Sequence, residues 1–151
     1  MEIFRIAQEE FSSSLFSSRR QARWNFDEEY VIYAASTRSL ATLEHAVRKN
    51  TISPDKIYKV MIISFDDDPA LINTITRNQL SKGWKDVYNY HITQQIGSDW
   101  YQKKSSLLLK IPSAIIDLEY NFIINTKHSD FEQLVSLSRI EPYDFDPRLL
   151  K

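Results

Sequence analysis

Residues 23–44, RWNFDEEYVIYAASTRSLATLE, place an irregular segment, an apolar segment and a helical pattern one after another. The apolar segment YVIYAA (residues 30–35) is rich in β-branched and aromatic residues, which predicts a buried strand. From about Thr37 to Lys49, apolar residues recur at steps of three and four, the period of one buried helix face. Ser36 or Thr37 can cap this helix. The stretch therefore predicts a strand followed directly by an amphipathic helix.

Glu44 falls within the apolar stripe of that helix, one turn from Leu40 and from Val47. Burying an unpaired carboxylate is costly, so this group must be paired, hydrogen-bonded, protonated or facing a cavity. Two interpretations stay open. Glu44 is either the structural partner of an arginine, with Arg23 and Arg38 as candidates, or a catalytic carboxylate that lines a pocket.

The amino-acid composition excludes several classes of protein. The chain has 151 residues, of which 42% are hydrophobic and 26% charged, so we expect one globular domain over residues 1–151. A net charge of −1 gives no electrostatic footprint for nucleic acid or for an anionic membrane. No apolar run approaches the roughly 20 residues of a spanning helix, and the first residues lack a signal-peptide pattern. We therefore expect a cytoplasmic protein.

Two residue types are scarce. With only Gly83 and Gly97, the chain cannot form a Rossmann fingerprint or a P-loop, so side chains must hold any phosphates. It has no cysteine, and its three histidines form no ligand pair, so we expect no metal. The run Asp66 to Asp68 has no cation-ligand spacing and predicts a solvated turn.

The rest of the chain predicts five or six strands and three helices in mixed order, which favours an α+β fold. Pro112 ends the strand SLLLKI and so places Ser113 at a strand end, a common position for functional residues. Further strands are expected at 2–6, 57–64 and 121–125, helices at 71–80 and 94–104, and either a strand or a short helix at 131–140.

One set of side chains is chemically coherent. Arg23 can bind a pyrophosphate in bidentate fashion, and Tyr33 offers a flat face for a nicotinamide ring. Glu44 can stabilise positive charge on a sugar carbon, and Ser113 can orient the substrate. Such a set suits cleavage of a nicotinamide glycosidic bond. Asn121 and Asn125, by contrast, lie four residues apart and have the pattern of asparagines that fix a loop.

Several blocks occur in the order of a known family. RWN, VIYAAS and a helix carrying LE are followed by IGSDWY, LLLKIPSAI, NFIINTKHSDF and YDFDPRLL. This order resembles the RES family of bacterial toxins over residues 4–150. The resemblance implies a fold similar to that of ADP-ribosyltransferase toxins, with a split mixed β core around an NAD cleft. It also implies NAD+ degradation, by hydrolysis or phosphorolysis, and an Xre-type helix-turn-helix antitoxin as partner.

The resemblance assigns the catalytic roles to Arg23, Tyr33, Glu44 and Ser113. It implies substrate contacts from Arg5, Arg23, Tyr33 and Asn125, and it matches Asn125 and His128 to a block whose role stays open. NAD+ is then a substrate, with inorganic phosphate as an optional co-substrate, and no cofactor is implied. One departure is that the glycines usual on both sides of RWN are missing in this chain.

We therefore expect a toxin that depletes NAD+ by cleaving the nicotinamide–ribose bond, as a phosphorylase or a glycohydrolase. One alternative is a protein ADP-ribosyltransferase that uses the same site. Another is a non-catalytic interaction domain in which Arg23 and Glu44 form a structural pair. The acceptor, the stoichiometry with an antitoxin and a homodimer are left open by the sequence.

Overall fold

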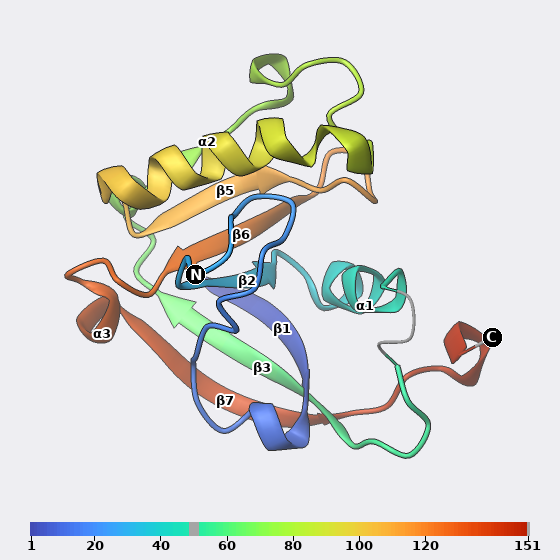
Figure 1. Ribbon diagram of the computed structural model, residues 1–151. Coiled ribbons are helices and arrows are strands. Elements are labelled where there is room, and N and C mark those ends of the chain that lie inside the picture. Colours follow the sequence, from blue (N-terminus) through green and yellow to red (C-terminus); the bar gives the residue numbers. More distant parts are fainter. Residues whose placement is uncertain (49–51, 151) are drawn as a thin grey trace.

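The computed structural model describes residues 1–48 and 52–150, which form one mixed sheet of seven strands with three α-helices (Figure 1). The strands are β1 (Glu2–Gln8), β2 (Val31–Ala35), β3 (Tyr58–Phe65), β4 (Ile72–Thr74), β5 (Leu108–Pro112), β6 (Tyr120–Asn125) and β7 (Val135–Tyr143). The helices are α1 (Arg38–Ala46), α2 (Tyr90–Lys103) and α3 (Phe131–Leu134). The order in the sheet is β4-β5-β6-β2-β1-β3-β7, and only β4 and β5 are parallel. The expected α+β class is confirmed.

The sheet opens between its two central strands. β2 pairs with β6 over five residues, whereas its register with β1 consists of one pair, Phe4 with Ala35. Next to that pair, the Arg5 guanidinium donates a hydrogen bond to the Tyr33 carbonyl at 3.0 Å. A side chain thus satisfies the main chain where the two strands part, and the result is a split β core.

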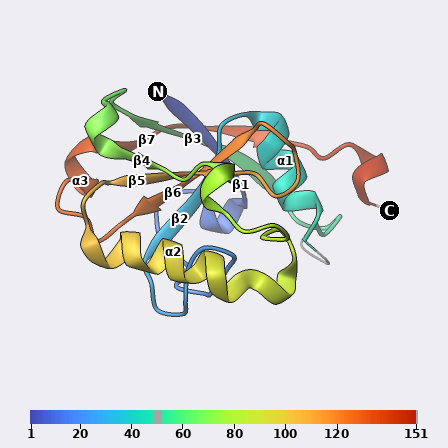
Figure 2. The same ribbon diagram turned by 90° about the horizontal axis from the view of Figure 1, so that it is seen from above.

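The side chains of β2 alternate between two faces, as a strand requires. Ile32 and Ala34 pack into one core with residues of β1, β3, β5 and β6. Val31 and Tyr33 point to the opposite face, where Trp100 and other residues of α2 cover β5 and β6. The residues of α1 also pack on this second face, against β1 and β3. Figure 2 shows that the two helices lie apart over their different strands. On this face of β2, Tyr33 packs in the core beneath α2 and Ala35 in the core beneath α1, so the strand runs from one helix to the other.

Helix α1 begins at a side-chain cap. Thr37 is the N-cap, and its hydroxyl accepts a hydrogen bond from the Leu40 amide at 3.1 Å. Leu40 and Ala41 are buried, so the first turn is fixed by the core. Val47, which the apolar stripe included, is 58% exposed instead, because the helix already ends at Ala46. Lys49, to which the pattern extended the helix, lies outside the described residues.

Helix α2 approaches the segment before β2 very closely. A Cβ atom added at Gly97 would lie 1.7 Å from the Trp24 carbonyl oxygen. Around this contact, the Thr93 hydroxyl donates to the Arg23 carbonyl at 2.5 Å, and the Gln94 amide donates to the Ala22 carbonyl at 2.9 Å. One face of α2 therefore holds the RWN segment through its main chain. Here a glycine serves helix packing and not a phosphate loop.

Three expectations for single elements need correction. Residues 71–80 are not a helix but the short strand β4 between two 3₁₀ turns, because the chain here adds a parallel edge strand beside β5. Helix α2 begins at Tyr90, four residues before the expected start. Residues 131–140 contain both of the alternatives, α3 followed by the first part of β7. Among the described residues, no helix is long and apolar enough to cross a membrane.

Near the RWN segment, where the family usually has glycines, two other residues adopt a backbone conformation that favours glycine. Arg19 and Glu28 have φ values of 57° and 64°, in the left-handed region that favours glycine. The Glu28 amide donates to the Arg19 carbonyl at 2.8 Å, so these two residues close the loop at its base. The loop thus keeps a glycine-like conformation without glycine, at a cost in backbone strain.

We expect Glu28→Gly to raise the free energy of unfolding by about 0.5–1 kcal/mol, because it relieves the left-handed strain. The ion pair with Arg19, 3.9 Å long and exposed, contributes little to this balance. Urea denaturation measures the change. Glu28→Ala is the matched control, since it removes the same charge but keeps a Cβ. Equal stability of the two variants would contradict the role of strain at this position.

Candidate active site

Glu44 is held by two neutral donors from neighbouring strand ends. Its Oε1 atom accepts hydrogen bonds from the Asn121 side-chain amide at 2.5 Å and from the Ser113 hydroxyl at 3.3 Å. Asn121 lies on β6, and Ser113 directly follows β5. Both bonds use the same carboxylate oxygen, Oε1.

Ser113 is completely buried, and its hydroxyl oxygen is fixed from behind. It accepts hydrogen bonds from the amides of Ile115 and Ile116, at 3.0 and 3.1 Å. With the oxygen used as an acceptor twice, its single proton is directed at Glu44. Ser113 therefore orients the carboxylate and is not arranged as a nucleophile.

Tyr33 lies near this group on the same face of the sheet. Tyr33 pairs with Ile123 and Ala35 pairs with Asn121, so Tyr33 and Asn121 are diagonal neighbours within reach of long side chains. The Tyr33 hydroxyl donates to Oδ1 of Asn25 at 2.7 Å and accepts from the Trp24 amide at 3.2 Å. Burial raises the pKa of Tyr33 well above its usual value. The phenol stays neutral and ties the RWN turn to strand β2.

We expect Tyr33→Phe to destabilise the protein by about 1–3 kcal/mol, because it leaves two buried groups unpaired. Asn25 and Trp24 are 1% and 2% exposed, so water does not replace the lost hydroxyl. Urea denaturation against Tyr88→Phe, at an exposed tyrosine, measures the difference. If both variants lost the same stability, the hydroxyl would have no structural role.

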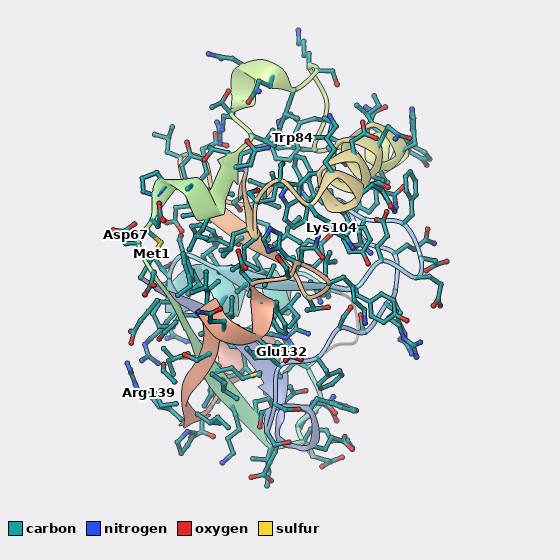
Figure 3. The ribbon with its side chains drawn as sticks, turned by 90° about the vertical axis from the view of Figure 1, so that its left-hand side faces the viewer. Met1, Asp67, Trp84, Lys104, Glu132 and Arg139 are labelled. Carbon is teal, nitrogen blue, oxygen red and sulfur yellow. The ribbon has the colours of Figure 1, made fainter. Side chains whose placement is uncertain are left out.

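Arg23 lies beside α2. Its guanidinium donates to the Trp84 carbonyl at 3.0 Å and lies over the Tyr90 ring, 4.5 Å from the centroid. Stacking on an aromatic ring and one carbonyl bond fix the plane of the guanidinium and leave further N–H groups for an anion. The segment that carries Trp84 lies at the upper end of the molecule in Figure 3.

Arg5 reaches the split between β1 and β2. Among the described residues its hydrogen bond is to the Tyr33 carbonyl, at 3.0 Å. Burial, with a smaller contribution from the positive charge of Arg48, lowers the pKa of Arg5 to about 10, so the side chain is still a cation at neutral pH. A desolvated cation of this kind is stabilised by an anion placed beside it.

Neither candidate arginine pairs with Glu44. Arg23 binds the Trp84 carbonyl, and Arg38 forms a bidentate pair with Glu141 on the surface, at 2.7 and 3.2 Å. The interpretation of Glu44 as one half of a structural ion pair with Arg23 or Arg38 is therefore wrong. The physical reason is that the antiparallel β5–β6 pair brings Ser113 and Asn121 to α1 instead.

Asn125 does not join this group. It is fully buried beneath the C-terminal part of α2, where its amide donates to the Tyr101 carbonyl at 3.1 Å. Its Oδ1 accepts from the Lys127 amide, and Nδ1 of His128 accepts from the Asp130 amide. Both side chains thus fix the turn between β6 and α3. A substrate contact from Asn125 stays a prediction that this geometry does not support.

Asn121 is the site residue that the sequence pattern missed. The pattern placed it with Asn125 as an asparagine of a structural type. Its partner Glu44 lies 77 residues earlier in the chain, so no local pattern reveals the contact. Its Oδ1 atom is buried and has no hydrogen-bond partner among the described residues.

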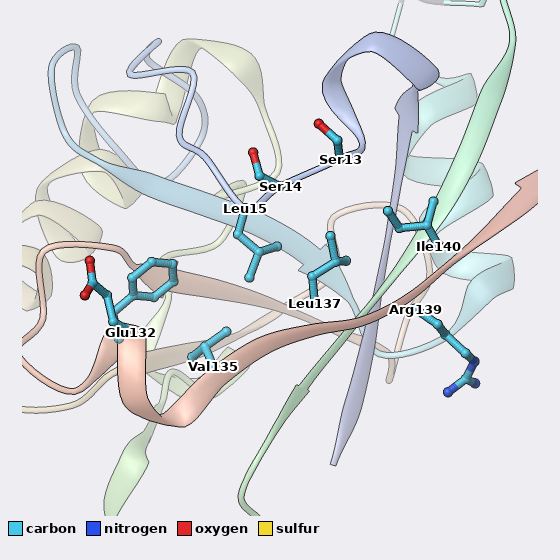
Figure 4. Close-up of a pocket in the computed structure, with 9 residues that line it drawn as sticks. Ser13, Ser14, Leu15, Glu132, Val135, Leu137, Arg139 and Ile140 are labelled. Atoms are coloured by element: carbon cyan, nitrogen blue, oxygen red, sulfur yellow. The ribbon is translucent and has the colours of Figure 1, made fainter.

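A cavity of the described residues lies away from this group. A hollow of about 550 Å³ is lined by residues of the 13–15 segment, α3 and β7, and Figure 4 shows Leu15, Val135 and Leu137 around it. Leu15 and Val135 pack with Ile32 and Ala34, on the face opposite to Tyr33. A second hollow, of about 10 Å³, adjoins Arg5. The described part of the chain has no group of three acidic, histidine or cysteine side chains that could hold a metal ion.

The likeness to known proteins covers the whole sheet. The sequence profile of the RES domain matches residues 2–146. A protein of Yersinia enterocolitica named Toxin Res is 28% identical over 153 residues, 99% of each chain. A Sphingobium protein named Prs ADP-ribosylating toxin is 32% identical over 130 residues, 85% of this chain and 80% of the relative.

A solved structure shares the fold. The M. tuberculosis MbcT–MbcA toxin–antitoxin complex contains a chain that matches with a TM-score of 0.68 at 16% identity, over 98% of this chain and 85% of that one. At that identity the match concerns the fold alone, and the sequence profile supplies the family. The chain belongs to the RES domain family of toxins.

Proposed function

We propose that this toxin cleaves the bond between nicotinamide and ribose in NAD+. The observation that carries the proposal is the Glu44 carboxylate, held through one oxygen by Ser113 and Asn121 next to Tyr33. The name of the Sphingobium relative describes that protein as ADP-ribosylating, a reaction in which the same bond breaks.

In the proposed reaction, nicotinamide leaves with the electron pair of the glycosidic bond, and positive charge develops on the ribose carbon. The Oε2 side of Glu44 stabilises this charge, because its other oxygen is already used by two donors. An acceptor then forms a bond to the same carbon and releases its proton.

Binding is assigned to the two arginines. Arg23 presents N–H groups beside the RWN turn, and Arg5 offers a desolvated cation at the strand split. We propose that they bind the pyrophosphate, and that the ring of Tyr33 packs against nicotinamide while its hydroxyl stays bonded to Asn25.

Water and inorganic phosphate are two candidates for the acceptor of the ADP-ribosyl group. A nucleophile on a protein is the alternative, and the name of the Sphingobium relative supports it. Labelled NAD+ added to a cell lysate with the purified chain separates them. We expect label in free small-molecule product. Label in a protein band, lost in Glu44→Gln, would establish protein modification instead.

We further propose that the reaction takes place in the cytoplasm and that an antitoxin of the Xre helix-turn-helix type neutralises it. The support is that the similar solved chain comes from a toxin–antitoxin complex. A homodimer is compatible with this assignment. Expression of the chain alone should deplete cellular NAD+ and arrest growth. Normal growth with ample folded protein would favour a non-catalytic interaction domain.

A further inference from the structure

The second turn of α1, which carries Glu44, contributes no fully buried residue to the hydrophobic core. Leu40 and Ala41 of the first turn are buried, whereas every residue from Thr42 to Ala46 is only partly buried. A helix of nine residues has little stability of its own and depends on packing. The position of the Glu44 backbone must therefore be set by other contacts.

The end of β7 and the residues after it contact both turns of the helix. Glu141 pairs with Arg38 at 2.7 Å, and the Tyr143 hydroxyl is hydrogen-bonded to the Thr42 hydroxyl. The Phe145 ring lies 5.4 Å from the His45 ring, measured between centroids. Figure 1 shows this segment running past α1 towards the C-terminal end.

The spacing on both sides is regular. The three residues of the segment are 141, 143 and 145, each partly buried, whereas 142, 144 and 146 are exposed. They meet helix positions 38, 42 and 45, one stripe along α1. Glu141 and Tyr143 also pair with Val60 and Tyr58 of β3, whose side chains face α1. An extended segment is thus laid lengthwise on the helix.

At Phe145, the contact between this segment and α1 includes a cluster of aromatic rings. Phe145 lies edge-on to Tyr58 and to Tyr143, with ring centroids 5.0 Å apart in each case. The His45 ring contacts Tyr58 at 5.5 Å, so the turn after Glu44 enters an aromatic cluster. Glu44 itself lies between the two contacted positions and turns to Ser113 and Asn121.

We propose that Glu141, Tyr143 and Phe145 form a positioning clasp. Glu141 holds the start of α1, and Tyr143 and Phe145 hold its second turn and so set the Glu44 carboxylate for the reaction. The clasp touches no substrate, so its residues are positioning residues. The inference rests on the proposed function for its catalytic consequence. Its structural half, the immobilised helix turn, is measurable without any turnover.

The test compares Phe145→Ala with Asp144→Ala, a truncation of the exposed neighbour on the same segment. Hydrogen exchange of the amides of residues 40–46 should speed up in Phe145→Ala alone. We expect kcat for nicotinamide release to fall by on the order of tenfold to a hundredfold with little change in KM, because Arg5 and Arg23 are untouched. Phe145→Tyr, which keeps the ring, should restore kcat.

Each other outcome decides the matter. If hydrogen exchange in α1 is unchanged in Phe145→Ala, the clasp is refuted, whether or not the parent chain turns over NAD+. Absence of turnover by the parent chain would refute the proposed function and not the clasp. A rise in KM with kcat intact also overturns the clasp. If Phe145→Ala does not fold, Tyr143→Phe gives the decision, since it removes only the hydroxyl bonded to Thr42. That variant should lower kcat, and parent kcat with parent exchange would refute the clasp.

Discussion

Replacing Glu44 by glutamine is expected to lower the rate of nicotinamide release from NAD+ by at least about a hundredfold while the fold is kept. The two properties separate because of how the side chain is held. Ser113 and Asn121 both donate to Oε1, and the amide oxygen of glutamine can accept the same two bonds. Only the negative charge, which we propose stabilises the ribose carbon, is lost.

The matched control is Glu132→Gln. Glu132 is an exposed carboxylate on α3 that lines the large hollow, on the face opposite to Tyr33. This variant removes the same charge from the same molecule and should keep the parent rate. Circular dichroism and urea denaturation establish that both variants are folded. A loss of rate shared by the two would identify the net charge of the molecule as the cause, and not the carboxylate beside Ser113 and Asn121.

The second large effect is expected at Gly97. In an ordinary helix interior, alanine in place of glycine stabilises by about 1 kcal/mol. Here the new Cβ would lie 1.7 Å from the Trp24 carbonyl oxygen, and the obstructing atom belongs to a main chain that cannot rotate aside. We therefore expect Gly97→Ala to destabilise the protein by about 1–3 kcal/mol, because overpacking outweighs helix propensity.

We expect Gly97→Ala to weaken the binding of NAD+ as well as the stability of the fold. The displaced segment carries Arg23, whose carbonyl is bonded to Thr93 on the same helix. We expect KM for NAD+ to rise, since the guanidinium can no longer keep both its Trp84 bond and its place over Tyr90. Gln95→Ala, on the exposed side of α2, is the control and should change neither property. Parent stability in Gly97→Ala would show that the contact relaxes freely.

Local features of the fold were predictable from the sequence. The strand at residues 31–35 and the helix after it follow from composition and periodicity, and the Thr37 cap follows from side-chain chemistry. The need of Glu44 for a polar partner was also predictable, because burial of a carboxylate is costly whatever the fold. The identity of that partner was not, since it depends on the β5–β6 pairing.

The errors have a common physical origin. Residues 71–80 have scattered apolar positions, but β4 forms only because β5 offers it a parallel edge. The role of Gly97 depends on a neighbour 73 residues earlier in the chain, Trp24, and nothing local reveals it. The contacts from 141, 143 and 145 to α1 likewise join two segments about a hundred residues apart. Sequence patterns indicate which buried polar side chains need a hydrogen-bond partner. The order of the strands in the sheet determines which residue that partner is.

The most direct test of the proposed function is release of nicotinamide from NAD+ by the purified chain, with and without inorganic phosphate, next to Glu44→Gln. We expect release by the parent and nearly none by the variant, and a dependence on phosphate would identify phosphate as the acceptor. Absence of release from the folded, partner-free parent would contradict NAD+ cleavage. Release by Glu44→Gln at the parent rate would contradict the assignment of Glu44 just as directly.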